Sequence, residues 1–308
     1  MRHFLIDTDT ASDDAIAIIM ALKELSIKVE AITVVAGNCP LEQCVENALK
    51  SVELANTYQP PVYVGVSKPL LCQQQTGVGV HGVDGLGNLN LSPAKLTVSD
   101  GHAVDAIIEK AKQFPGELEI VTIGPLTNLA LALLNEPELP RLVKHVYIMG
   151  GTGFGPGNVT SVAEFNIWAD AEAAQIVVGS DLNKSIVGWD VCLGDAFFDA
   201  KDIERLHAIG PLGEFAARST QLLREFGRKF GKDGIDLADP STMAVAMYPE
   251  IVTKRLDTFA EVDYKSEAGY GQLIIDKFRV SGNKHNTTII YDIDADIFKN
   301  KLYDLLSA

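Results

Sequence analysis

The sequence predicts an α/β protein with an open, mostly parallel central sheet flanked by helices, followed by a C-terminal β appendage and a closing helix. Short apolar runs alternate with helical stretches, which is typical of strand–helix–strand units. The apolar runs are nearly unbroken, as expected for strands whose two faces are both covered by helices. Toward the C-terminus the pattern changes to strands that follow one another without long helices between them.

The expected elements can be placed in chain order. Strands of the main sheet are predicted at Phe4–Asp7, Val29–Ala36, Leu118–Ile123, His145–Met149 and Ser185–Trp189. The helices between them are predicted at Asp13–Leu25, Leu41–Asn56, His102–Gln113, Leu126–Leu134 and Ala171–Val178. The appendage and the closing helix are predicted at Thr258–Tyr264, Gly271–Ile275, Asn286–Asp292 and Ala295–Leu306. No linker separates these parts, so residues 1–308 are expected to form a single domain.

The composition limits the classes of partner. The chain is 47% hydrophobic, which provides material for a large core, and its 41 acidic against 26 basic residues give a formal charge of -15. Such a surface repels phosphate backbones, so a nucleic acid polymer is not an expected partner, although plain solubility explains the charge equally well. No apolar stretch approaches the roughly 20 residues that span a bilayer, and Asp7 precedes any signal-peptide apolar region. A cytoplasmic protein without a membrane partner is therefore expected.

An acidic segment follows the first predicted strand. Asp7, Asp9, Asp13 and Asp14 lie within eight residues, where an open α/β sheet binds its ligands. These carboxylates would repel one another unless a cation lies between them, and oxygen ligands favour Ca²⁺ or Mg²⁺. The alternative is structural: acids in a helix's first turn complement its dipole, with Ser12 as the N-cap.

Part of this pattern resembles the haloacid-dehalogenase phosphatases. An apolar strand precedes Asp-x-Asp, and Gly194–Asp199 is similar to their late acidic motif. That resemblance implies a Mg²⁺-dependent phosphatase with Asp7 as the nucleophile. Those enzymes have Thr or Val where this chain has Ala11, and their pattern leaves Asp13 and Asp14 unexplained.

A second resemblance covers nearly the whole chain. Asp-Thr-Asp-x-x-x-Asp-Asp resembles the signature of the inosine-uridine nucleoside hydrolase family. Further segments match that family in the same order, namely Thr33–Asn38, His81–Gly87, Gly124–Ala130, Met149–Gly151, Gly157–Ile167 and Asp239-Pro240. Each motif alone is weak, but their shared order favours this family over the phosphatases.

The resemblance implies Ca²⁺-dependent hydrolysis of the N-glycosidic bond of ribonucleosides, giving free base and ribose. Asp9 would be the general base on a metal-bound water. The implied Ca²⁺ ligands are Asp9, Asp14, the backbone carbonyl of Ile123, and Asp239. The implied contacts of the ribose 2′- and 3′-hydroxyls are Asp13, Asn38, Asn166 and Asp239, and those of the 5′-hydroxyl are Asn158, Glu164 and the Met149 backbone. The family also implies a homo-oligomer, either a dimer or a tetramer.

The chain departs from the family at one position. Many members carry His before the late Asp, where it can protonate the departing base, but this chain has Ala238. His81 is then a candidate donor, and Trp168 could stack on the base. The base preference stays open, because the segments that would set it, 72–82 and 221–236, match the family least. Ala238 also keeps open a nucleoside- or ribose-binding protein with weak catalysis, and Asp239 before Pro240 could be only a helix cap.

Overall fold

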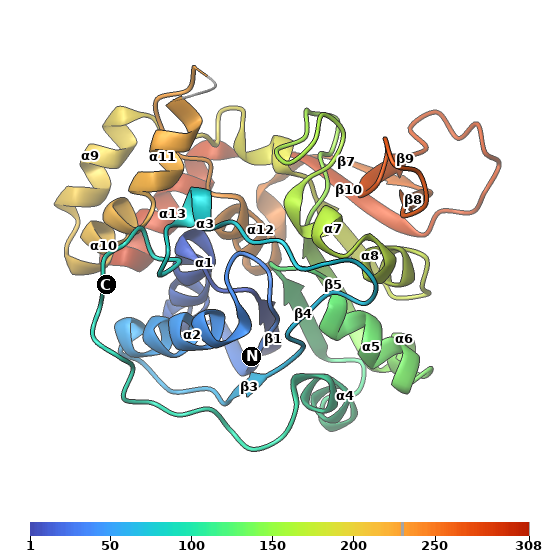
Figure 1. Cartoon of the computed structure of the whole chain (residues 1–308), viewed down its shortest axis with the longest axis horizontal. Coiled ribbons are helices and arrows are strands. Elements are labelled where there is room, and N and C mark those ends of the chain that lie inside the picture. The colour runs from blue at the N-terminus through green and yellow to red at the C-terminus, as the bar shows by residue number, and fades with distance from the viewer. Residues whose placement is uncertain (229–230, 308) are drawn as a thin grey trace.

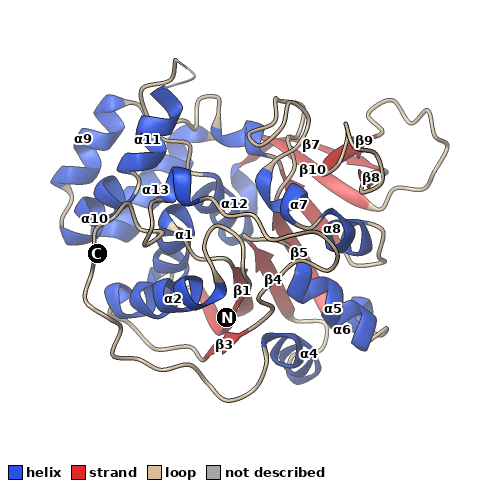
Figure 2. Ribbon diagram, in the orientation of Figure 1, coloured by secondary structure: helices blue, strands red, loops and turns tan. Residues whose placement is uncertain are grey.

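The computed structural model describes residues 1–228 and 231–307. In this part of the chain an eight-stranded sheet has the order β3-β2-β1-β4-β5-β6-β10-β7 (Figures 1 and 2). Its strands are β1 (Arg2–Thr8), β2 (Ile27–Val34), β3 (Val62–Val64), β4 (Leu118–Thr122), β5 (Val143–Met149), β6 (Lys184–Val187), β7 (Val252–Thr258) and β10 (Thr287–Ile293). A separate two-stranded sheet contains β8 (Ala260–Asp263) and β9 (Gln272–Ile275). The predicted α/β class with a mostly parallel central sheet is confirmed.

The direction of the strands determines at which edge of the sheet a functional site can form. Neighbouring strands from β3 through β10 pair in parallel, and only β7 pairs antiparallel, with β10. The carboxyl ends of the parallel strands therefore meet at one edge of the sheet. From β1 the chain builds outward through β2 and β3, and later through β4, β5 and β6 on the other side. A crevice forms at such a switch point, just beyond the carboxyl ends of β1 and β4.

The helices form two layers. One face is covered mainly by α1 (Ser12–Lys23), α2 (Leu41–Ala55), α9 (Ala200–Ala208), α10 (Pro211–Ser219), α12 (Ala238–Met247) and α13 (Ala295–Ser307), which share one hydrophobic core. The other face is covered by α4 (Ala103–Gln113), α5 (Thr127–Asn135), α6 (Leu139–Leu142) and α8 (Ala171–Val178), in a second core. Shorter or peripheral elements are α3 (Val78–His81), α7 (Phe165–Ala169), α11 (Gln221–Arg228), and the 3₁₀ helices η1 (Trp189–Cys192) and η2 (Pro249–Ile251). Figure 1 shows α1, from the start of the chain, beside α12 and α13, which come from its end.

Burial explains the apolar runs of the central elements. From Phe4 to Thr8 strand β1 is buried on both faces, and α1 is buried from Ser12 to Leu22. A helix that is apolar on every side must be covered on every side. Helices α2, α10, α12 and α13 provide that cover, so the segment between β1 and α1 is held rigidly.

The C-terminal region differs in detail from its prediction. The predicted strand Thr258–Tyr264 is divided at Phe259 between β7 and β8, and β7 begins earlier, at Val252. The Asn286 side chain causes part of this change of sheet, because it accepts a hydrogen bond from the Ala260 N–H and donates one to the Ala260 carbonyl. The appendage is therefore the β8–β9 hairpin, whereas β7 and β10 extend the main sheet. None of the helices in the described ranges is both long and apolar enough to cross a membrane.

Candidate active site

Polar side chains from several strand ends gather at the carboxyl edge of the sheet. The segment between β1 and α1 supplies Asp9, the first turn of α1 supplies Asp13 and Asp14, and the loop after β2 supplies Asn38. A cavity opens here, and its lining includes Asp13, Asn38, His81, Ile123, Met149, Asn158, Glu164, Asn166, Trp189, Leu223, Phe226, Asp236, Ala238 and Asp239. Most of the residues singled out in the sequence therefore border one space.

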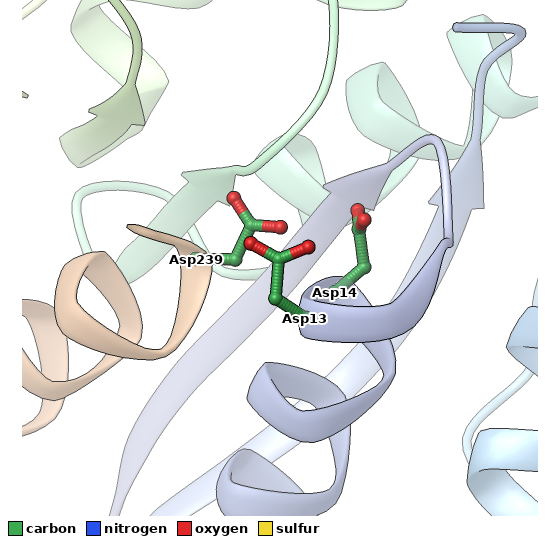
Figure 3. A group of neighbouring side chains, drawn as sticks. All are labelled: Asp13, Asp14 and Asp239. Carbon is green, nitrogen blue, oxygen red and sulfur yellow. The ribbon is translucent and has the colours of Figure 1, made fainter. Parts of the chain in front are cut away.

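Three carboxylates meet at this cavity, two of them in its lining (Asp13 and Asp239) and the third, Asp14, buried beside them. Asp13, Asp14 and Asp239 each place an oxygen within 4.8 Å of the others (Figure 3). The sequence left open that Ser12 and Asp239 cap helices, but Ala11 and Leu237 hold the two N-cap positions. Ser12 and Asp239 instead lie in the first turns of α1 and α12, which pack together. We refer to Asp13, Asp14 and Asp239, together with Asp9, as the carboxylate floor.

Asp9 lies behind the cavity surface, beside Asp14. Its Oδ2 accepts a hydrogen bond of 2.6 Å from the Asn38 N–H, while Oδ1 is buried without a hydrogen-bond partner among the described residues. A side chain at Gly37 or Gly124 would collide with the Asp9 carboxylate, which explains the glycine in both motifs. The buried Oδ1 is an acceptor that lacks a donor, which is costly unless a cation or a water satisfies it.

Burial, followed by mutual repulsion, sets the electrostatics of the floor. Burial, with the charges of neighbouring Asp residues, raises the pKa of Asp9 and of Asp239 well above the ordinary value. Burial also raises the pKa of Asp14, and the negative charge of Asp13 raises it further. Burial raises the pKa of Asp13 to about 6. A set of buried oxygen donors that repel one another fits a hard divalent cation, which would remove that repulsion. The floor could therefore hold a metal ion.

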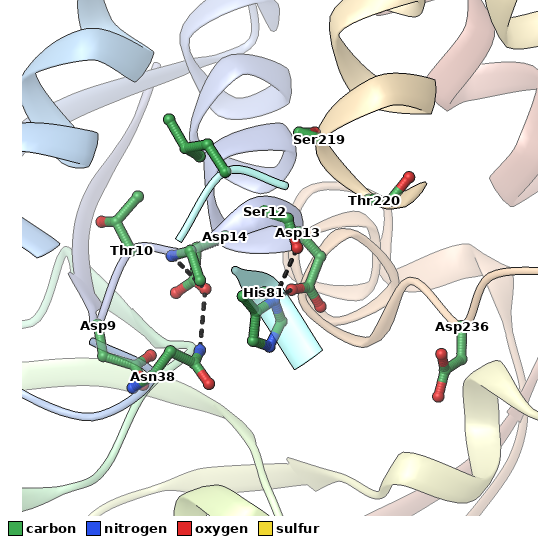
Figure 4. A network of polar contacts seen from close by, with 12 residues as sticks. Asp9, Thr10, Ser12, Asp13, Asp14, Asn38, His81, Ser219, Thr220 and Asp236 are labelled. Atoms are coloured by element: carbon green, nitrogen blue, oxygen red, sulfur yellow. Dashed lines mark hydrogen bonds and ion pairs between the residues drawn. The ribbon is translucent and has the colours of Figure 1, made fainter. Parts of the chain in front are cut away.

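His81 is fixed against the floor. Its Nδ1 lies 2.7 Å from the Ser12 hydroxyl and 3.9 Å from an oxygen of Asp13 (Figure 4). Burial lowers its pKa to about 4, so the imidazole is neutral at pH 7. Asn38 belongs to the same network, because its amide donates to Asp14 over 3.4 Å.

The side of the cavity beyond β4 and β5 carries amides and one buried acid. The Asn166 amide donates over 3.3 Å to the carbonyls of Ile123 and Met149, which places Asn166 between the ends of these strands. Glu164 accepts hydrogen bonds of 2.9 Å from the N–H groups of Asn166 and Gly151, and burial raises its pKa to about 7. Asn158 accepts from the Phe165 N–H and also lines the cavity. These groups suit a ligand with several hydroxyls.

The geometry gives the phosphatase interpretation no support. Asp7, its required nucleophile, is fully buried, and its Oδ1 accepts hydrogen bonds from Thr33 and Asn128. Within the described ranges the cavity lining also contains no Lys or Arg, the residues that bind phosphate groups.

The opposite side of the cavity is apolar and aromatic. Trp189 of η1, Leu223 and Phe226 of α11, and Asp236 form what we call the base-side wall. The sequence identified the segment 221–236 but none of these residues, and Trp189 was expected only as the end of a strand. Trp168, which was expected to stack on the base, does not line this cavity; it borders a separate pocket with Cys72 and Tyr270.

The comparisons with known proteins agree with this arrangement. The family described as inosine-uridine preferring nucleoside hydrolase matches residues 4–300. A pyrimidine-specific ribonucleoside hydrolase, RihA of Salmonella gallinarum, is 35% identical over 98% of this chain and 97% of its own.

Two solved structures also match over nearly their whole length. The plant nucleoside hydrolase PpNRh1 has a TM-score of 0.93 at 30% identity, covering 100% of this chain and 99% of its own. The purine-preferring ribonucleoside hydrolase of Gardnerella vaginalis has a TM-score of 0.92 at 28% identity, covering 99% and 98%. The chain is therefore a hydrolase of N-glycosyl compounds and belongs to the inosine-uridine preferring nucleoside hydrolase family.

Proposed function

We propose that this protein hydrolyses the N-glycosidic bond of ribonucleosides with Ca²⁺ bound at the carboxylate floor and Asp9 as the general base. The observation that carries the proposal is that the two sides of one cavity differ in chemical character. Buried carboxylates and amides occupy one side, and aromatic and aliphatic side chains occupy the other. A ribonucleoside has the same division between its hydroxylated sugar and its flat base.

The metal would be held by oxygen atoms of Asp9, Asp14, Asp239 and the Ile123 carbonyl. The unpartnered Oδ1 of Asp9 and the close approach of Asp14 and Asp239 support this set. Asp13 belongs to the same group of three, so it is placed to contact either the ion or the sugar. A flexible set of carboxylate and carbonyl ligands is more typical of Ca²⁺ sites than of Mg²⁺ sites. When bound, the cation would supply charge that lowers the pKa of the attacking water.

The polar residues around the floor would hold the ribose. All of these residues line the cavity. In this proposal, Asp13, Asn38, Asn166 and Asp239 would form hydrogen bonds with the 2′- and 3′-hydroxyls, and Asn158, Glu164 and the Met149 backbone with the 5′-hydroxyl. Buried groups that bind hydroxyls reject sugars that lack them, because the groups would be left unpaired. We therefore expect ribonucleosides to be cleaved faster than 2′-deoxyribonucleosides.

The bond-breaking step builds positive charge on the sugar ring. The Asp9 carboxylate would take a proton from water as the oxygen of that water attacks C1′. The surrounding carboxylates would stabilise the developing charge, since they form a fixed negative environment that is screened from solvent. His81, neutral and held by Ser12, would border the substrate and not serve as the base.

One experiment tests the proposal. The full-length protein is incubated with a panel of ribonucleosides, their 2′-deoxy forms and a phosphomonoester, with Ca²⁺ or with Mg²⁺, and free ribose and free phosphate are measured. We expect ribose from at least one ribonucleoside, no phosphate, and loss of at least about 99% of the rate with a chelator, restored by Ca²⁺. Tight binding without ribose would instead indicate a binding protein, and full activity of the metal-free protein would reject the metal.

A further inference from the structure

The cleavage needs a proton that the usual residue cannot supply. The electron pair of the broken bond goes to the base, and a neutral base leaves more readily when it is protonated. Ala238 has no proton to give. His81 is held through Nδ1 by the Ser12 hydroxyl on the floor side of the cavity. Another acid of the cavity must therefore be considered.

The described lining offers four carboxyl groups besides His81. Asp13 and Asp239 belong to the carboxylate floor, and Glu164 accepts backbone hydrogen bonds on the sugar side. Asp236 is the remaining one and is the carboxyl group of the base-side wall. In Figure 4, His81 and Asp13 lie between Asn38 and Asp236, so Asp236 is separated from the metal-binding side.

The Asp236 carboxyl is also held in a fixed orientation. Its Oδ2 accepts a hydrogen bond of 2.8 Å from the indole Nε1 of Trp189, another residue of the wall. In the described part of the chain this is the one hydrogen bond recorded for the Asp236 carboxyl from another side chain. The second oxygen, Oδ1, is thereby left able to carry a proton, in a cavity that Trp189 and Phe226 also line.

We propose that Asp236 is the acid that protonates the departing base, in place of the histidine that Ala238 replaces. This inference rests on the proposed function of the cavity. As the bond between C1′ and the base nitrogen breaks, its electron pair passes to the base, which takes the Asp236 proton. The attacking water gives its hydroxyl to C1′ and its proton to Asp9. The cycle closes when Asp9 releases a proton to solvent and Asp236 takes one up.

The electrostatic surroundings of Asp236 favour this role. Burial raises the pKa of the Asp236 carboxyl to about 6, and the charge of Asp13 of α1 adds to this rise. The backbone N–H of Asp236 itself, the hydrogen bond from Trp189 and the charge of Lys232 lower the pKa without cancelling the rise. The Lys232 ammonium lies over the ring of Phe197, 5.8 Å from its centre. Cys192 of η1 stays neutral because burial raises its pKa well above the ordinary value, and α11 presents Leu223 and Phe226 to the cavity. A base bound against this wall would exclude water and raise the pKa of Asp236 further, toward the range in which a carboxyl group acts as an acid at neutral pH.

The test compares leaving groups that need a proton with one that does not. In the Ca²⁺-loaded protein, Asp236→Asn is expected to lower kcat for the best ribonucleoside by at least about 100-fold. Turnover of 4-nitrophenyl β-D-ribofuranoside, whose phenolate leaves without a proton, should change by less than about threefold. The fall of kcat/KM at high pH, where an acid loses its proton, should also disappear in the variant.

Asp190→Asn is the matched control. Asp190 is also a partly buried Asp whose pKa burial raises to about 6, and it accepts a hydrogen bond from the Phe154 N–H, but it does not line the cavity. In Asp190→Asn, kcat for the ribonucleoside and for 4-nitrophenyl β-D-ribofuranoside should change by the same factor, and kcat/KM should still fall at high pH.

Three results would overturn the assignment of Asp236. They are an equal loss on both substrates, no loss on the ribonucleoside, and a high-pH decline that persists in Asp236→Asn but is abolished by His81→Ala. Failure of the wild-type protein to release ribose from any ribonucleoside would instead reject the proposed function itself.

Discussion

The two sides of the cavity are built in different ways. The carboxylate floor comes from residues next to the end of β1 and in the first turns of α1 and α12, and its members are between 0% and 7% exposed. The base-side wall comes from η1, α11 and the segment before α12, and of its four residues only Leu223 is buried, at 8% exposed. The floor is thus part of the core, whereas the wall is attached to it. Changes in the wall therefore disturb the fold less than changes in the floor.

The relatives are consistent with this difference. RihA of Salmonella gallinarum is named pyrimidine-specific, whereas the structural neighbour from Gardnerella vaginalis is named purine-preferring. Proteins with the same fold thus differ in the base they accept. A fixed sugar-binding floor with a variable wall would produce this range, and the following changes test that separation.

The largest effect is expected at the floor. Asp9→Ala removes the proposed general base and should lower kcat by at least about 100-fold. Asp7→Asn is the control, because Asp7 lies two residues before Asp9 and is equally buried, but its Oδ1 accepts hydrogen bonds from Thr33 and Asn128 and it is not one of the proposed metal ligands. Its kcat should stay within about tenfold of the wild type. Near-normal turnover of Asp9→Ala on ribonucleosides would show that the base lies elsewhere.

A smaller effect is expected at the aromatic part of the wall, apart from Asp236. Phe226→Ala removes an aromatic surface on which a base can stack, so KM should rise about tenfold while kcat changes less. Phe197→Ala, which alters a nearby aromatic residue outside the cavity lining, should leave KM unchanged. If Phe226→Ala lowered kcat as strongly as Asp9→Ala, the two sides of the cavity would not be separable.

A modest effect on stability is expected from Glu164. Burial raises its folded pKa to about 7, so between its ordinary value and pH 7 the folded state binds a proton that the unfolded chain has released. Stability therefore falls as the pH rises through this range. From pH 6.5 to 8.0 the thermal midpoint of the wild type should fall by about 1–2 °C more than that of Glu164→Gln. Calorimetry of both proteins in chelator would measure the difference, and parallel curves would contradict it.

The smallest effect is expected at Trp168. This residue borders a different pocket, so Trp168→Phe should leave both KM and kcat for ribonucleosides within about twofold. A rise in KM that varied with the identity of the base would restore the stacking role suggested by the sequence.

The sequence predicted the floor better than the wall for a physical reason. Asp9, Asp13 and Asp14 follow a buried strand directly, and the carboxyl ends of parallel strands meet at one edge, so their proximity could be inferred. Asp239 could be added only through the family resemblance, because nothing local distinguishes it from a helix cap. The elements of the sheet were predicted close to their observed bounds wherever the apolar runs were long.

The wall could not be predicted in the same way. Trp189 lies on a 3₁₀ turn that immediately follows β6, and sequence alone extended the strand through it. Phe226 and Trp168 are both aromatic residues in helical segments, and only the tertiary packing directs one into the cavity and the other away from it. In the sequence, Asp236 is a polar residue shortly before a helix, and such a residue needs no functional role to account for it. Its contact with Trp189 depends on two loops that are distant in sequence.

The packing of α1 against α12 and α13 has a consequence for biosynthesis. Asp13 and Asp14 leave the ribosome near the start of translation, but Asp239 follows only when most of the chain has been made. Until then α1 lacks the cover of α12 and α13, although α2 is already present, and the three carboxylates cannot meet. Incomplete translation products should therefore be inactive as hydrolases. They should also expose part of the apolar surface of α1, which quality-control factors can detect.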